Sequence, residues 1–194
     1  MLFLNGVRGI CRGDRCRLSN ASPCLFAAQQ ALLENQTHWH ETIVHRTGDG
    51  AIKKVALIQL IYVSSLVNQD ETQLASILES AVRHNREDGI TGMLLYSGGN
   101  FLQVLEGPKE QVHNTYQRIC LDPRHTQIMV LSEDEVAERH FATWSMGYRQ
   151  LGQADVEKFP QYAPYFQFGF RSSRFDAKPG IALEMLVLFS KNML

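Results

Sequence analysis

The sequence predicts an α+β fold in which a ferredoxin-like βαββαβ sheet is extended by one further strand and covered by C-terminal helices. Three patterns support this fold class. The run VALIQLIYV is almost continuously apolar, as in a central strand buried on both faces. The segment GITGMLLYSGGNFLQVLEG has the pattern of two strands joined at a Gly98-Gly99-Asn100 turn. Apolar residues recur at helical spacing both before and after this hairpin.

The first strand begins at Val55, and an amphipathic helix follows it. Asp70 precedes that helix. Its predicted buried stripe contains Leu74, Ile77, Leu78, Ala81 and Asn85. An amide therefore lies at the end of an otherwise apolar face.

A second helix is predicted over residues 109–120, and Asp122-Pro123 ends it. Its apolar side carries Val112, Tyr116 and Ile119. The segments TQIMVLSEDEV and FATWSMGYRQL are the predicted fourth strand and the added strand.

The patterned region divides the chain into residues 1–53, 54–150 and 151–194. The first part is expected to be poorly ordered or partly helical, with helical character only in ASPCLFAAQQALLENQ and linker character in HRTGDG. It is either a loose tail or a stretch upstream of a translation start near Val55. In the last part, IALEMLVLF forms a helix too apolar to stand alone in water, so it is expected to dock on the sheet or on another subunit.

The composition fits one compact domain with tails. The net charge is -1 and no long Lys/Arg block is present, so neither nucleic acid nor an anionic membrane is an expected partner. The four cysteines form no disulfide framework, which favours a reducing cytoplasm. No apolar run approaches the length of a membrane span. His38, His40 and His45 lack recognised ligand spacing, so no metal site is expected.

Three polar side chains stand where burial is expected. Gln103 interrupts the strand FLQVL, Asn85 lies on the apolar helix stripe, and Tyr62 ends the first strand. A buried amide without partners costs about 1–3 kcal/mol. These groups are therefore expected to bond either to one another, as a self-satisfied core network, or to a ligand.

As a set, IYVSSL, the HN of RHNREDGITGMLLY, FLQVLEG, DPRH and F.TWSMG occur in the order and approximate spacing of the BLUF family of blue-light photoreceptors. The chain resembles that family over about half of its length. The loop after Tyr62 is one residue shorter than in family members, whereas the spacing from Asn85 to Gln103 is the same.

The resemblance implies a noncovalent flavin, FAD as is usual in the family or FMN, held between the two helices. Ile77 and Ile119 would sandwich the ring, and Asn85 would bond its pyrimidine edge, since an amide offers both a donor and an acceptor. The positions around the polar edge and the ribityl-phosphate side match His84, Arg118, Asp122, Arg124 and His125. Without a ligand, Arg118 and Asp122 would be an exposed helix pair four residues apart.

Tyr62 and Gln103 match the photoactive pair of the family. A phenol can pass an electron and a proton to an excited flavin, and a glutamine amide can rotate or tautomerise between two hydrogen-bond states. Trp144 and Met146 match a strand edge that relays the change to the C-terminal helices. Because they are two residues apart, they are expected on the same face of their strand, where such a pair is otherwise ordinary core filling.

The sequence therefore predicts a blue-light photoreceptor, not an enzyme, that signals through self-association or an unknown downstream protein. The terminal helix, expected to be marginally docked, would serve association but not the spectral change. One alternative is a ferredoxin-like interaction module without flavin. The other is a flavin or small-molecule enzyme, which is disfavoured because no Gly-rich phosphate loop or catalytic triad pattern is present.

Overall fold

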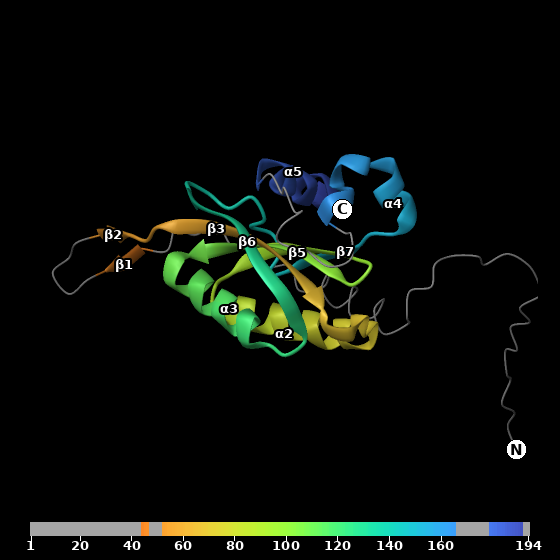
Figure 1. Ribbon diagram of the computed structural model, residues 1–194. Coiled ribbons are helices and arrows are strands. Elements are labelled where there is room, and N and C mark those ends of the chain that lie inside the picture. The colour runs from red at the N-terminus through yellow and green to blue at the C-terminus, as the bar shows by residue number, and fades with distance from the viewer. Residues whose placement is uncertain (1–43, 47–51, 166–178, 192–194) are drawn as a thin grey trace, which may run out of the picture.

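The computed structural model describes residues 44–46, 52–165 and 179–191. The helix expected within ASPCLFAAQQALLENQ lies outside the described residues. The first described elements are two short strands that pair in antiparallel fashion, β1 (Val44–Arg46) and β2 (Ile52–Lys54). This ribbon, which the sequence did not predict, projects from the start of the main sheet (Figure 1).

The main sheet has five strands in the order β6-β3-β5-β4-β7. The strands are β3 (Leu57–Leu66), β4 (Thr91–Ser97), β5 (Asn100–Pro108), β6 (His125–Val136) and β7 (Gly147–Gln150). All neighbouring strands are antiparallel except β4 and β7, which are parallel. The first four strands have the ferredoxin-like arrangement, and β7 is the predicted added strand beside β4.

The hairpin between β4 and β5 turns at two glycines. Gly98 and Gly99 have φ values of 52° and 85°, and Ser97 pairs with Asn100 across the turn. Two successive residues with positive φ make the tight turn that matches the twist of an antiparallel pair, and only glycine adopts this conformation without steric cost. The turn sets the register between β4 and β5, and β5 lies in the middle of the sheet because its other edge pairs with β3.

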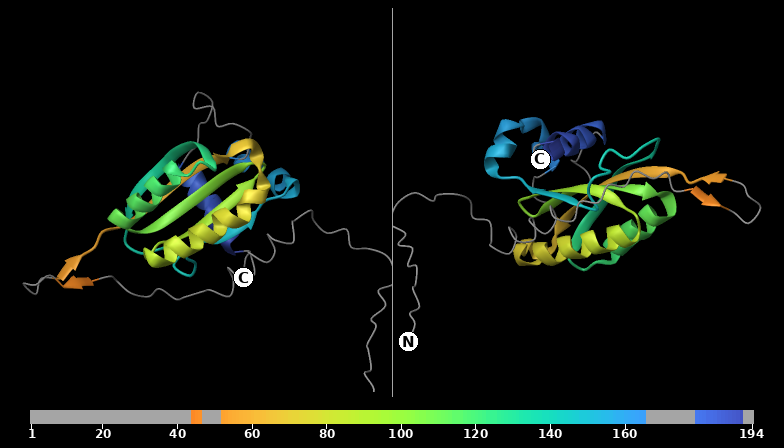
Figure 2. Two further views of the ribbon diagram at one scale, coloured as in Figure 1. Left: turned by 90° about the horizontal axis from the view of Figure 1, so that it is seen from below. Right: turned by 180° about the vertical axis from the view of Figure 1, so that it is seen from behind.

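Helices cover both faces of the sheet (Figure 1). On one face lie α2 (Leu74–Glu87) and α3 (Lys109–Leu121), and the view from that side shows them next to each other across the strands (Figure 2, left). Asp70 caps the short 3-10 turn that leads into α2, by accepting a hydrogen bond from the Thr72 amide at 3.2 Å. The other face carries α4 (Gln153–Lys158), a 3-10 segment η3 (Pro160–Tyr165) and α5 (Pro179–Ser190).

The sheet therefore separates two cores. Along β5, Phe101 and Leu105 point to the core beneath α2 and α3, whereas Leu102 and Val104 point to the core beneath α5. This alternation follows from the two-residue period of a strand. It explains why β3, β4 and β5 are apolar on both faces, as the run VALIQLIYV predicted.

The terminal helix α5 docks on the sheet of its own chain, which is one of the two placements that the sequence predicted. Its inner side chains Ala182, Met185, Leu186 and Phe189 are at most 2% exposed. The expectation that this helix is marginally docked was therefore wrong: α5 supplies a large part of the second core. The described helices include none that is long and apolar enough to cross a membrane.

Candidate functional site

A pocket of about 420 Å³ opens between α2 and α3, over the middle of the sheet. This volume lies in the range of small-molecule and cofactor sites. All nine residues predicted to contact a cofactor line it, together with Tyr62: Ile77, His84, Asn85, Gln103, Arg118, Ile119, Asp122, Arg124 and His125. The structure thus brings together residues from two helices, three strands and the turn after α3.

Six further residues line the pocket that were not predicted as cofactor contacts: Ser80, Ala81, Leu94, Thr115, Leu121 and Pro123. Ser80 and Ala81 lie three and four residues after Ile77, so helical spacing was a signal that could have found them. Leu94 gave no such signal. It reaches the pocket because β4 pairs it directly with Gln103 of β5.

The two residues predicted as the photoactive pair lie on neighbouring strands. Tyr62 of β3 stands directly opposite Gln103 of β5, and its hydroxyl donates a hydrogen bond to Gln103 Oε1. On the other side, Gln103 Nε2 donates to the sulfur of Met146 at 3.4 Å. The amide therefore presents its acceptor to the phenol and its donor to the thioether. A half turn of the amide would present its donor to the phenol oxygen and remove the hydrogen bond to the sulfur, which has no proton to donate.

The phenol of Tyr62 is fully buried. Burial raises its pKa well above the ordinary value, because the phenolate would lose its hydration. The Tyr62 ring meets the Tyr116 ring of α3 edge-on, with centroids 5.4 Å apart. Tyr62 is therefore held as a neutral hydrogen-bond donor in one orientation.

Asn85 lies near the C-terminal end of α2 and is buried, as its place on the apolar stripe predicted. Its Nδ2 donates to the backbone oxygen of Ser145 at 2.8 Å. The two pocket amides, Asn85 and Gln103, thus contact consecutive residues, Ser145 and Met146. Both groups reach the same short segment before β7.

Ion pairs form the rim of the pocket. Arg124 holds Asp122 with two nitrogens, at 2.9 Å from Nε to Oδ1 and 2.6 Å from Nη2 to Oδ2, and its Nη1 reaches Ser76 of α2 at 2.9 Å. These hydrogen bonds from Arg124 hold the Asp122 pKa below its usual value. Arg118 pairs with Asp88 instead, so the exposed Arg118–Asp122 pair considered from the sequence does not form. Asp122 thus binds an arginine of its own turn, whereas Asp88, just after α2, binds an arginine of α3.

His125 completes the pocket on the β6 side. Its Nδ1 lies 3.0 Å from the hydroxyl of Ser64, and its ring is 4.9 Å from the centroid of Phe101. Burial lowers the His125 pKa to about 4, because the imidazolium would lose hydration, and the nearby Asp122 only partly offsets this. The ring is therefore neutral at pH 7.

We expect His125 to make the fold sensitive to mild acid. The unfolded chain protonates this histidine as the pH falls through 6.5, whereas the folded chain does so only near 4. Its contribution to stability is thus complete above about pH 6.5 and is lost between these values, by up to about 3 kcal/mol. Urea unfolding at pH 7 and pH 4.5 measures the loss. The variant His125→Asn should lose clearly less over the same interval, and equal losses would contradict the assignment.

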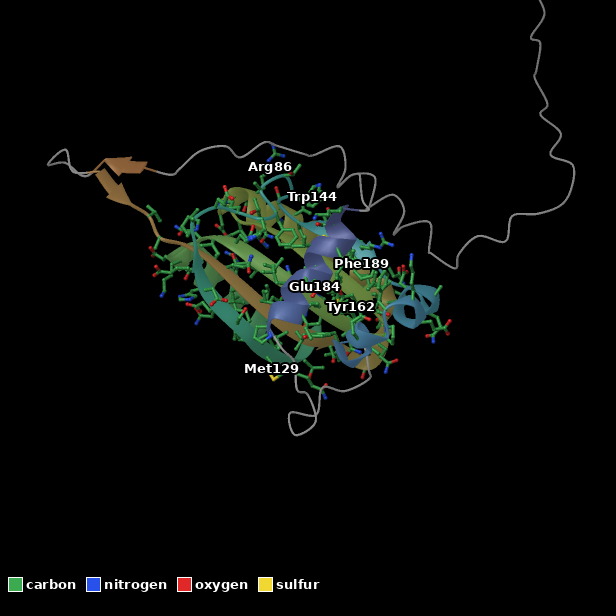
Figure 3. All side chains as sticks on the ribbon, turned by 90° about the horizontal axis from the view of Figure 1, so that it is seen from above. Arg86, Met129, Trp144, Tyr162, Glu184 and Phe189 are labelled. Carbon is green, nitrogen blue, oxygen red and sulfur yellow. The ribbon has the colours of Figure 1, made fainter. Side chains whose placement is uncertain are left out.

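The prediction that Trp144 and Met146 share one face of a strand was wrong. β7 begins only at Gly147, and the two residues lie in the irregular connection before it. Met146 is buried in the core beneath α2 and α3, whereas Trp144 packs against the core on the α5 side. Figure 3, which views the α5 side, labels Trp144 beside that helix. The backbone turns at this point because Trp144 N donates to Phe141 O at 3.3 Å and Gly92 N donates to Trp144 O at 3.1 Å.

Comparison with known proteins identifies the arrangement. Residues 57–147 match the family model described as sensors of blue-light using FAD. They form a BLUF domain. The BLUF sequences it resembles include photoactivated adenylate cyclase subunit beta of Euglena longa, at 36% identity over 105 residues, and the blue light- and temperature-regulated antirepressor BluF of Escherichia coli, at 38% over 91 residues. These matches cover 53% and 46% of this chain, but only 12% and 23% of the two relatives.

The solved structure of BlrB, a BLUF protein in its dark state, is similar over a longer stretch. It covers 72% of this chain and 98% of its own, with 25% identity and a TM-score of 0.57. The BLUF match confirms the resemblance, the α+β ferredoxin-like fold and the prediction of a flavin-binding sensor domain.

The residues of the pocket fit a flavin. Ile77 and Ile119 supply apolar walls from facing helices, and Leu94 lies beneath them on the sheet. Asn85 and Gln103 each offer a donor and an acceptor, which suits the alternating carbonyl and N–H groups at the polar edge of an isoalloxazine. Aliphatic walls with a few convergent polar groups are the usual form of a cofactor site.

Proposed function

We propose that this protein is a blue-light photoreceptor that holds FAD between α2 and α3 and signals by rearranging the hydrogen bonds of Gln103. The observation that carries the proposal is the chain of contacts Tyr62–Gln103–Met146 in the wall of the pocket of a BLUF domain. When bound, the flavin supplies blue-light absorption and a one-electron acceptor. The protein supplies the donor and the switch.

In this mechanism Tyr62 is the electron and proton donor. Its burial keeps the phenol protonated in the dark. Its hydrogen bond to Gln103 Oε1 provides the path along which the proton can be transferred. With the phenol proton passed on through Gln103 to the flavin, Gln103 would have no donor on that side, so the amide would gain by turning its Nε2 toward Tyr62. That turn removes the Nε2 contact to Met146. The electron and the proton would then return to Tyr62, so that only the orientation of the amide differs from the dark state. One amide thereby has two stable states, as a switch requires.

The experiment that tests the proposal is an absorption spectrum of the purified protein before and after blue light. We expect a yellow protein whose flavin band shifts reversibly to longer wavelength by a small amount. Protein that stays colourless after reconstitution with FAD would end the proposal. It would favour the second candidate, an interaction module whose polar groups satisfy one another, as Asn85 does with Ser145.

The cofactor is proposed to be FAD, on the family description. Heat release of the bound flavin followed by chromatography distinguishes FAD from FMN.

Gln103→Leu is expected to retain flavin and to lose the red shift, because leucine fills the space but offers neither donor nor acceptor to Tyr62 and Met146. The spectra of dark and illuminated protein measure both properties. The matched control is Gln117→Leu, which removes an exposed amide from α3 and should photocycle normally. A normal red shift in Gln103→Leu would mean that the switch is assigned to the wrong residue.

For the output, we propose association with an unidentified protein partner or with a second copy, in a cytoplasmic setting and without a catalytic step in the described domain. In the proposed division, residues 54–150 sense light, residues 151–194 relay the signal, and residues 1–53 are an extension. The relay is supported by contacts from β7 to both terminal helices: Arg149 lies 3.3 Å from Asp155 of α4 and 5.0 Å from the ring centroid of Phe189 of α5. Light scattering in darkness and under blue light tests for a change in assembly.

A further inference from the structure

A buried carboxylate lies on the sheet face opposite to the pocket. Glu106 follows Gln103 by three residues on β5, and its exposed fraction is 0%. Since Leu102 and Val104 point to the α5 side, strand alternation places Glu106 on that side as well, whereas Gln103 points to the pocket. The mechanism above makes no use of this group.

Glu106 is fully engaged by hydrogen-bond donors. Oε1 accepts from Gln59 Nε2 at 2.8 Å and from the backbone amide of His140 at 3.0 Å, and Oε2 accepts from the backbone amide of Phe141 at 2.8 Å. The His140 ring adds its Nδ1 at 3.4 Å. Two consecutive backbone amides are thus held by one side chain.

The neighbouring Arg139 strengthens the same attachment. Its Nη1 donates to the backbone oxygen of Glu106 at 2.7 Å and to Thr91 Oγ1 at 2.9 Å, and its Nη2 donates to the Gly89 oxygen at 2.7 Å. Residues 139–141 are therefore fixed to the start of β4 and to the end of β5 by directional bonds. We refer to these contacts of Glu106 and Arg139 as the clamp.

The clamped residues lead directly into the segment that both pocket amides contact. Phe141 O accepts from Trp144 N, and Ser145 and Met146 then reach Asn85 and Gln103. The Gln103 contact to sulfur at 3.4 Å is weak because a thioether is a poor acceptor, so it cannot by itself determine where Met146 lies. The clamp is the strong, charge-assisted end of this connection.

A buried carboxylate is a poor way to gain stability, because the loss of hydration offsets most of its attraction to donors. It does impose geometry, since each bond has a required direction. We infer that Glu106 is a positioning residue of the photoswitch: by clamping residues 139–141 it sets the position of Met146 against Gln103. This inference rests on the proposed function only for its consequence under light, because the placement itself exists in the dark.

The test is the methyl resonance of Met146 in the dark, assigned with Met146→Leu, in the full-length chain. Glu106→Gln keeps the shape but replaces one acceptor oxygen with an NH2 group that opposes a backbone N–H. Because a hydrogen bond to a charged group is among the stronger ones, its loss should lower the ratio of clamped to displaced Met146 at least about tenfold. A second Met146 peak should appear, and the light-induced change should shrink with the clamped population.

Two controls separate positioning from general loosening. Glu138→Gln changes an exposed carboxylate in the same connection and should leave the Met146 resonance unchanged. Leu74→Ala destabilises the fold at the far start of α2, where Leu74 is 0% exposed. If Leu74→Ala displaces Met146 as much as Glu106→Gln does, the clamp is only structural and the inference is overturned.

An unchanged Met146 resonance in Glu106→Gln also overturns the inference. Should that variant fail to fold, Arg139→Lys weakens the clamp from its partly exposed side, and it must displace Met146 in the same direction for the inference to stand. If Glu106→Gln displaces Met146 while the unaltered protein shows no red shift with bound flavin, the positioning role stands and the proposed function fails.

Discussion

Replacing Tyr62 with phenylalanine is expected to leave flavin bound and to abolish the light-induced red shift. Phenylalanine keeps the packing of the buried ring against Tyr116 but removes the hydroxyl that donates to Gln103. Without the redox-active phenol and its proton, light no longer changes the hydrogen bonding at Gln103 Oε1, so the amide stays in its dark orientation. The spectra of the dark and illuminated protein measure the loss. We expect the fraction of protein that reaches the red-shifted state to be less than about a tenth of the normal fraction, since an increase of about 1.4 kcal/mol in the barrier already slows a step tenfold.

The matched control is Tyr116→Phe, which removes a phenol hydroxyl from the other ring of the same pair. Among the described residues, the Gln103 side chain forms its hydrogen bonds with Tyr62 and Met146 and not with Tyr116, so this variant should keep the red shift. If Tyr62→Phe photocycles normally, or if both variants lose the shift equally, the electron and proton donor is not Tyr62.

Truncation at the C-terminal helix is expected to destabilise the whole domain, not to leave the photocycle intact. Four side chains of α5, among them Leu186 and Phe189, are nearly fully buried against the sheet. Replacing a single buried leucine with alanine costs about 2–5 kcal/mol, which is a large share of the 5–15 kcal/mol that stabilises a typical domain. Deleting residues 179–194 should therefore unfold or aggregate the protein.

The point variant Leu186→Ala measures this effect without truncation. We expect its free energy of unfolding, from urea titration followed by circular dichroism, to fall by about 2–5 kcal/mol. Leu183→Ala on the same helix is the control, because Leu183 is only partly buried and should cost less than half as much. If the deletion mutant kept its midpoint of urea unfolding and its absorption spectrum, α5 would not be an essential part of the second core.

Local sequence patterns were enough to place the pocket helices. Ile77, Ala81 and Asn85 follow one another at four-residue spacing, which keeps all three within the broad apolar face of α2, so the amide was predictably buried. The hairpin was equally local, since Gly98 and Gly99 specify the turn by themselves. The missed pocket residue Leu94 depends instead on which strands pair.

Trp144 and Met146 show where local patterns fail. A two-residue spacing predicts one face only if the segment is a regular strand, and this segment is not. Its backbone bonds to partners distant along the chain: Trp144 O to Gly92, Ser145 O to Asn85, and the preceding Phe141 N to the Glu106 carboxylate. These partners are 35 or more residues away, and their bonds give the segment its irregular path. The residue pattern near Trp144 therefore gives no indication of these long-range hydrogen bonds.

The amino-acid sequence alone was sufficient for the order of strands and helices in the main sheet, the family, and ten of the side chains around the pocket, because these depend on short-range periodicity and on motif order. It did not reveal that α5 is core, that Trp144 and Met146 face opposite sides, or that Glu106 holds the connection between them. Those features depend on strand register and on contacts between distant residues. Such contacts exist only in the assembled sheet, so the free energy that selects them is that of the folded molecule and not of any local segment.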